Sequence, residues 1–266
     1  MDEPVFHADG TGFLPTGHAR GPWDPQALHG GAPAALLARA VERFAPDPDL
    51  RVARLSYEFL RPIPLGRLEL EIELLRPGRR VQLIGASLSA GGVEVCRVTG
   101  LRMARTPADL GPMSRVLSTP YVRPETLTTT PFALGRAEGH SFASTGVEMR
   151  FARGGVDAGP AAVWLRLRRP IVDAEEPSQL MRVAAAADFA NGVSWELDFR
   201  RFVFINPDLV VALWREPRGE WVLLDSSTRA EPQDGAIAFS GLHDPDGQIG
   251  LGIQSLLVAD REDRPA

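Results

Sequence analysis

The sequence of 266 residues contains no lysine, so all 29 of its basic residues are arginine. This absence excludes Schiff-base chemistry and a Walker-type phosphate-binding loop, because both need a lysine. The single cysteine, Cys96, excludes disulfide bonds within the chain and cysteine-rich zinc sites. No stretch approaches the roughly 20 consecutive apolar residues of a membrane helix, and the acidic start lacks the apolar segment of a secretory signal. We therefore expect a cytoplasmic protein that does not enter a membrane.

Charge and histidine spacing argue against two further kinds of site. The net charge is -5 and the arginines form no basic cluster, which argues against a nucleic acid as partner. The five histidines do not have the spacing of metal ligands along the chain. We therefore predict no metal site and no cofactor.

What the sequence does contain is the same pattern twice: one long helix with several antiparallel strands. The first helix, 30–44, has apolar residues on one face and Pro33 in its first turn, where a missing N–H costs nothing. The second helix, 179–190, is rich in alanine. Alternating apolar residues predict the strands, which lie at 51–60, 68–74, 81–88 and 93–103 in the first half and at 141–151, 161–168, 209–214, 221–228, 236–242 and 248–258 in the second.

These elements predict an α+β protein made of two similar units. The units are expected at 1–110 and 136–266, with a connecting segment rich in proline and threonine at 111–135. Aligning the turn glycines Gly92 and Gly247 pairs Thr99 with Gln254. In each unit a sheet curls over its helix, and two units side by side can share one continuous sheet that protects their edge strands. This arrangement is a double hotdog fold.

Short motifs in both halves point to one family. They are His29-Gly30-Gly31 at the start of the first helix, Asp188 to Ser194 at the end of the second, and Gln254 on the last strand. Together they resemble the acyl-CoA thioesterase II-like, double-hotdog family. The resemblance implies hydrolysis of an acyl-CoA thioester by an activated water, and pairing of chains into a homodimer. Carried over residue by residue, it implies that Asp188, Ser194 and Gln254 hold this water, with Thr228 or Ser226 as alternative hydroxyl residues.

The residue types agree with these roles, although each residue also has a purely structural explanation. Burial of Asp188 among apolar neighbours would destabilise its charged form and make it a stronger base, and an acidic group at a helix C-terminus is unfavourable without a functional reason. It could equally face solvent before the stop signal Asn191-Gly192. The amide of Gln254 can accept from water and donate to a carboxylate at once, unless it points outward from its strand. Ser194 could simply cap a turn.

The start of the first helix is the candidate substrate-binding element. N–H groups at a helix start can bind an oxyanion, and glycines such as Gly30 and Gly31 let a thioester carbonyl approach closely. The ordinary alternative is a flexible start to the helix, with His29 as a polar packing residue.

The sequence is compatible with three functions. The leading hypothesis is an acyl-CoA thioesterase of fatty acid metabolism. The alternatives are a catalytically degenerate acyl-CoA-binding protein and an enoyl-CoA hydratase of the hotdog type. The hydratase would need a histidine beside its aspartate, and His29 is the one residue that could partner Asp188.

Overall fold

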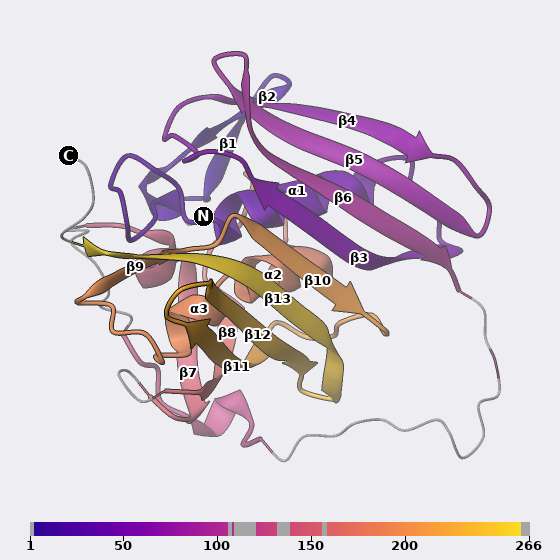
Figure 1. The fold of residues 1–266 in the computed structure, drawn as a ribbon. Helices are drawn as coiled ribbons and strands as arrows, with labels where there is room; N and C mark the ends of the chain where they lie inside the picture. Colours follow the sequence, from indigo (N-terminus) through magenta and orange to yellow (C-terminus); the bar gives the residue numbers. More distant parts are fainter. Residues whose placement is uncertain (1–2, 106–107, 109–120, 132–138, 156–158, 262–266) are drawn as a thin grey trace.

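The computed structural model describes residues 3–105, 108, 121–131, 139–155 and 159–261 (Figure 1). Most of the connecting segment predicted at 111–135 lies outside these residues. The described part of the N-terminal half contains one long helix and six strands: β1 (Phe6–Asp9), β2 (Gly12–Pro15), a 3-10 turn η1 (Gly17–Ala19), α1 (Gly31–Arg43), β3 (Leu50–Phe59), β4 (Leu68–Arg76), β5 (Val81–Ala90) and β6 (Val93–Ala104).

The C-terminal half repeats the plan with one additional short helix. Its described elements are η3 (Pro124–Thr126), a π-helical turn η4 (Phe142–Gly146), β7 (Val147–Arg153), β8 (Ala161–Leu167), α2 (Gln179–Ala187), α3 (Ala190–Val193), β9 (Phe202–Ile205), β10 (Asp208–Leu213), β11 (Val222–Glu231), β12 (Gly235–Asp244) and β13 (Gly247–Asp260). None of the helices in the described residues is both long and apolar enough to cross a membrane.

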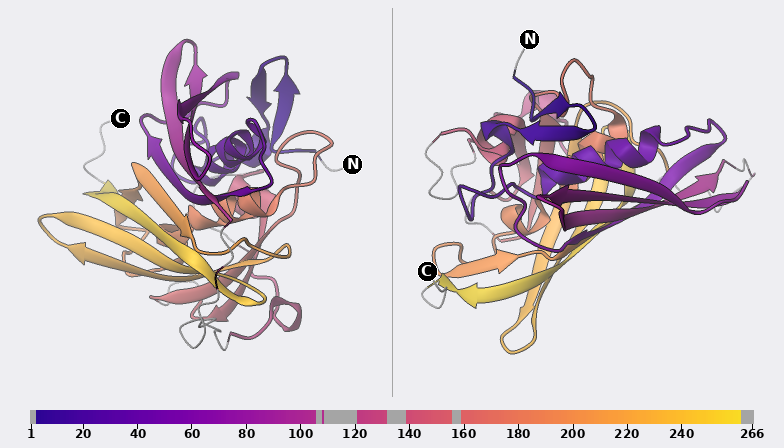
Figure 2. Two further views of the ribbon diagram at one scale, coloured as in Figure 1. Left: turned by 90° about the vertical axis from the view of Figure 1, so that its right-hand side faces the viewer. Right: turned by 90° about the horizontal axis from the view of Figure 1, so that it is seen from above.

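The strands of both halves form one antiparallel sheet. Their order is β1-β2-β4-β5-β6-β3-β10-β13-β12-β11-β8-β7, and β9 pairs with β13 beside this path. The halves are joined where β3 pairs with β10, with Ser56 opposite Val210. The sheet curves around the two helices, which lie together between the halves (Figure 2). The predicted double hotdog fold with a shared sheet is therefore confirmed.

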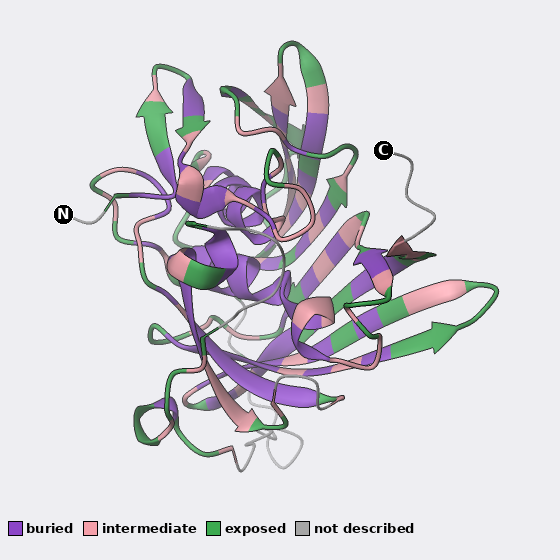
Figure 3. Ribbon diagram, turned by 90° about the vertical axis from the view of Figure 1, so that its left-hand side faces the viewer, coloured by how far each residue is buried: buried purple, intermediate pink, exposed green. Residues whose placement is uncertain are grey.

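The two helices form the buried centre of the molecule (Figure 3). α1 and α2 pack antiparallel, so that the start of α1 meets the end of α2. Gly31 makes this contact possible, because a Cβ there would lie 2.7 Å from the Ala185 carbonyl oxygen. α2 begins at Ser178, whose hydroxyl accepts from the Met181 N–H at 3.2 Å, and it ends at Asp188. The expected single helix over 179–190 is thus interrupted at Asp188.

One detail of the predicted repeat is wrong. Thr99 was aligned with Gln254, yet the two side chains occupy opposite faces of the sheet. In β6 the neighbours Val98 and Gly100 are buried and Thr99 is partly exposed, whereas Gln254 is completely buried in β13. Because side chains alternate along a strand, an alignment that is one residue out exchanges the two faces.

Candidate active site

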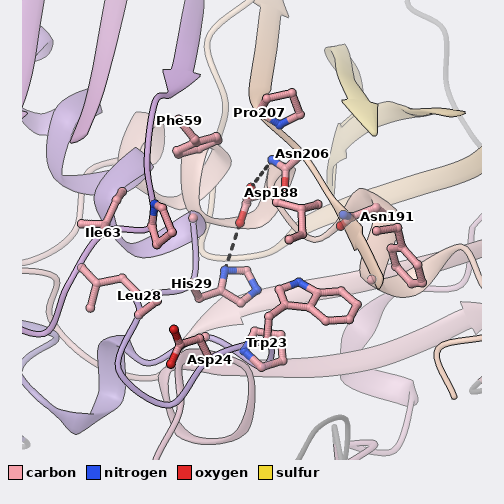
Figure 4. Close-up of a pocket in the computed structure, with 18 of the residues that line it drawn as sticks. Trp23, Asp24, Leu28, His29, Phe59, Ile63, Asp188, Asn191, Asn206 and Pro207 are labelled. Atoms are coloured by element: carbon pink, nitrogen blue, oxygen red, sulfur yellow. Dashed lines mark hydrogen bonds and ion pairs between the residues drawn. The ribbon is translucent and has the colours of Figure 1, made fainter. Parts of the chain in front are cut away.

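Asp188 lies at the point where the two halves meet. It directly follows and caps α2, only 4% of its side chain is exposed, and it lies on the wall of a cavity (Figure 4). Its Oδ1 accepts from Asn206 Nδ2 at 2.9 Å and from Gln254 Nε2 at 3.3 Å. Its Oδ2 lies 3.0 Å from His29 Nδ1. The carboxylate is therefore held by side chains from the segment just before α1, from β13 and from the loop between β9 and β10.

Gln254 is fixed by the backbone around it. Its Nε2 donates to the Asp188 carbonyl oxygen at 3.2 Å, and its Oε1 accepts from the Asn191 N–H at 3.3 Å. Because a backbone N–H can only donate, this contact assigns which end of the amide is oxygen. Gln254 points inward and is completely buried, so the alternative of an outward strand residue does not hold. Its amide is occupied in holding the end of α2.

His29 joins the start of α1 to this carboxylate. Its Nδ1 accepts from the Gly31 N–H at 3.0 Å and also lies 3.0 Å from Asp188 Oδ2. One ring nitrogen cannot accept and donate at the same time. Nδ1 has a single lone pair, so it either accepts from the Gly31 N–H or donates to Asp188 Oδ2, and in the second case the Gly31 N–H is released from the ring. A proton transferred within this pair therefore changes which groups the start of α1 can offer to a ligand.

Gly30 allows the two helix ends to approach. A Cβ on Gly30 would lie 2.8 Å from Asp188 Oδ2 and 2.9 Å from Oδ1, closer than real side-chain atoms come. Steric contact thus explains the two glycines of the motif His29-Gly30-Gly31, because both face the end of α2. The structure brings His29, Gly30, Asp188 and Gln254 together from distant parts of the sequence.

Ser194 is not placed with them. Its side chain is buried, donates to the Ala190 carbonyl oxygen at 2.8 Å and lies 2.6 Å from Thr228 Oγ1. Ser226, the other alternative, pairs with Ser240 at 2.6 Å. In the described structure these hydroxyls bond to one another and to backbone, and Asp188 receives its side-chain hydrogen bonds from amides instead.

Asn206 is the site residue that sequence reasoning missed. It lies in the run Asn206-Pro207-Asp208, which is typical of a turn and was interpreted as one. Its Nδ2 donates to the carbonyl oxygen of Asp208 at 3.2 Å as well as to Asp188. The turn geometry and the contact with Asp188 are therefore made by the same amide. A signal was present, since the run directly precedes a strand whose neighbour, β13, carries Gln254.

The cavity in front of Asp188 is largely apolar and has a volume of about 350 Å³. Aromatic rings form one side of it: Trp23 stacks on Phe199 at 4.7 Å between ring centroids, and Phe204 meets Trp23 edge-on at 5.2 Å. Phe59, Ile63 and Leu28 form the opposite side (Figure 4). A polar carboxylate at the wall of an apolar cavity suits a ligand with an apolar chain and a reactive polar group.

Comparison with known proteins agrees with this arrangement. Models of the acyl-CoA thioesterase N-terminal and C-terminal domains match residues 19–103 and 124–258. An acyl-CoA thioesterase II, TesB2, from Mycobacterium marinum superposes with a TM-score of 0.67 at 16% identity, over 90% of this chain and 92% of its own. A hotdog-fold protein of unknown function from Alicyclobacillus acidocaldarius gives 0.72 at 15% identity, over 98% and 96%. No curated protein matches in sequence.

The two matching domain models, on a double hotdog sheet, assign the chain to the class of thioester hydrolases built from two hotdog units. The two domain models match in order, and the second alone spans more than half of the chain. The chain therefore belongs to the acyl-CoA thioesterase family.

Proposed function

We propose that this protein hydrolyses an acyl-CoA thioester in the cavity next to Asp188. The observation that carries the proposal is the position of the Asp188 carboxylate, which is almost completely buried, contacts an apolar cavity and is held by two uncharged amides and one imidazole. Such a carboxylate can accept a proton from water at the moment when water attacks a carbonyl carbon.

Groups on the cavity wall can accept and return the proton that the proposed reaction transfers. The oxygen of the water forms a bond with the thioester carbon, and Asp188 accepts the proton that the water loses. The carbonyl oxygen, which becomes negative, lies at the start of α1, where the Gly31 N–H can donate to an oxyanion once His29 Nδ1 no longer accepts it. The C–S bond then breaks, and the proton held by Asp188 and His29 passes to the leaving sulfur. The apolar cavity holds the acyl chain.

Gln254 and Asn206 have a different role in this proposal. Both donate to Asp188 Oδ1, and neither needs to touch the substrate. They are positioning residues, which direct the carboxylate and leave Oδ2 for His29 or water. Ser194 takes no part, because its hydroxyl is bonded to Ala190 and Thr228.

The experiment is an assay of free thiol release from short, medium and long acyl-CoAs, with Asp188→Asn measured beside the unchanged protein. We expect turnover that depends on chain length and is lost in the variant, while its circular dichroism spectrum and melting temperature show that it folds. Full activity in the variant would remove Asp188 as the base. Binding of acyl-CoA by the unchanged protein without any thiol release would favour the degenerate binding protein.

One observation favours a second candidate, the enoyl-CoA hydratase. His29 Nδ1 and Asp188 Oδ2 lie 3.0 Å apart, so the aspartate–histidine pair that hydration would need does form, across the two halves. The same preparation tests it with a trans-2-enoyl-CoA. A hydratase removes the absorbance of the conjugated double bond without releasing thiol, whereas a thioesterase releases thiol and leaves the double bond intact.

A cytoplasmic location, a homodimer and a place in fatty acid metabolism stay predictions. The match to acyl-CoA thioesterase domains and the apolar cavity support the last of these.

A further inference from the structure

A second cluster of ionisable side chains lies outside the cavity. Glu3, His18 and His140 each place one potential ligand atom within 4.8 Å of the other two. They come from three separate segments: the chain before β1, the turn η1, and the residue two positions before η4. Only 1% of His18 is exposed, whereas Glu3 and His140 are on the surface. The cluster therefore has one fixed member and two that can move.

Hydrogen bonding fixes the proton on the His18 ring. The Thr145 hydroxyl donates to the Ser141 carbonyl oxygen at 2.8 Å, so its lone pairs must accept from His18 Nδ1, which lies 2.7 Å away. Nδ1 therefore donates to Thr145, which leaves Nε2 as the ring nitrogen that a metal ion could bind. Nε2 lies 2.9 Å from Glu3 Oε2, a contact that either a shared proton or a metal ion can bridge.

We propose that Glu3, His18 and His140 bind a divalent transition-metal ion of the zinc class. Two imidazole nitrogens and one carboxylate oxygen form a set of ligands that zinc accepts, with a further position for water. A ligating histidine usually donates its other ring N–H to a neighbouring oxygen, which sets its tautomer and orientation, and His18 Nδ1 has this arrangement with Thr145. The site does not depend on the function proposed for Asp188.

Binding requires both exposed ligands to move. The His18 and His140 rings stack at 4.5 Å with 18° between their planes. Bonds of about 2.0–2.1 Å to one ion place ligand atoms about 3.4 Å apart. The His140 ring must therefore turn until its lone pair and that of His18 point at the same ion. Arg169 adds positive charge beside the site, donating to the backbone oxygens of Glu3 and Thr145. Both features are expected to weaken the affinity for a cation.

The ion would join segments that also support the active site. The Ala19 carbonyl oxygen, next to His18, accepts from the His29 N–H at 2.9 Å. The ring of Phe142, two residues after His140, lies 5.4 Å from the His29 ring. Metal binding is thus expected to stabilise the turns η1 and η4, and its measurable effect is on thermal stability.

The test is a titration of chelator-treated full-length protein with Zn²⁺ alone, followed by calorimetry and by thermal melting. We expect one ion per chain and a higher melting temperature in its presence. His140→Ala and Glu3→Gln, both at exposed positions, should each weaken binding at least about tenfold while the fold is retained. His7→Ala is the matched control, since His7 is exposed and lies 2.8 Å from a single carboxylate, that of Asp173.

Two results would overturn the proposal. One is the absence of stoichiometric Zn²⁺ binding by the unchanged, folded protein. The other is binding that His140→Ala and Glu3→Gln leave unchanged, which would place the ion elsewhere on the chain. Equal losses in His7→Ala and His140→Ala would likewise indicate scattered surface binding.

Discussion

The two ends of the α1–α2 pair hold a carboxylate in opposite ways, one almost completely buried and one partly exposed. At the end where α1 begins, Asp188 is bonded by the amides of Asn206 and Gln254 and lies beside a neutral or protonated imidazole. At the other end, Glu175 accepts two hydrogen bonds from Arg39, at 2.6 and 2.5 Å, and Arg43 adds a third at 3.0 Å. One end opens on a cavity, and the other is closed by an ion pair.

The difference shows which carboxylate is available for chemistry. Hydrogen bonds from Arg39, together with the charges of both arginines, lower the pKa of Glu175, so this group stays ionised and cannot usefully take a proton. Among the contacts of the described residues, Asp188 has amide and imidazole partners instead of arginines. The corresponding position just after α1 is Phe44, which has no acid–base function. Under the proposed function we therefore expect Asp188 to be the base of a single site, although the fold is repeated.

The largest predicted effect separates these two carboxylates. Asp188→Asn should lower thioester turnover by at least about 100-fold, because it removes the group that accepts the proton from water. Glu175→Gln makes the same chemical change at the other end of the helix pair and should leave turnover near that of the unchanged protein. The measurement is kcat for one acyl-CoA substrate with all three proteins.

The comparison would fail if both variants lost activity to the same extent. That result would indicate that either change disturbs the packing of α1 on α2. Melting temperatures measured beside kcat distinguish this outcome, since Asp188→Asn retains the shape of the side chain and should melt close to the unchanged protein.

A second, smaller effect is predicted at Gln254. Gln254→Ala removes the amide that holds the Asp188 carbonyl oxygen, the Asp188 carboxylate and the Asn191 N–H, and leaves these groups buried without that partner. We expect kcat to fall by about 30-fold and stability by about 1–3 kcal/mol. Thr99→Ala, at the outward position of β6, is the control and should change neither. Loss of stability without loss of kcat would show that Gln254 is purely structural.

A third prediction concerns Asn206, the partner that sequence patterns did not identify. Asn206→Ala removes one of the two amides that bond to Asp188 Oδ1 and leaves Gln254 in place. We expect kcat to fall about tenfold, which corresponds to about 1.4 kcal/mol, while KM stays nearly constant. A change confined to KM would instead assign Asn206 to substrate binding.

Much of the fold could be predicted because its signals are local. The alternation at 68–74 and the turn glycines Gly92 and Gly247 each report on neighbouring residues, and they predicted the strands that form the sheet. The register between the halves is not local. The alignment of the two halves was one residue out at Thr99. A turn can be one residue longer or shorter without a visible change in composition, and one residue is enough to exchange the faces of a strand.

Site residues were predictable where a single polar residue interrupts an apolar helix or strand. Asp188 at the end of an alanine-rich helix and Gln254 in an apolar strand are such exceptions, and the structure brings them together. Asn206 was missed because Asn-Pro-Asp satisfies the chemistry of a turn by itself. Glu3, His18 and His140 could not be found by spacing, because three distant segments bring them together.

The smallest predicted effect concerns the closed end of the helix pair and pH. The pKa of Glu175 lies below its ordinary value of 4.5, mainly through the hydrogen bonds from Arg39. A carboxyl group whose pKa is depressed by folding stabilises the protein above its unfolded pKa, and this contribution is lost as the pH falls through the folded value. Glu175→Gln should therefore cost about 1 kcal/mol at neutral pH and progressively less below pH 4.5. Urea unfolding of both proteins across that range measures the difference, and a cost that does not depend on pH would mean that Glu175 acts through packing alone.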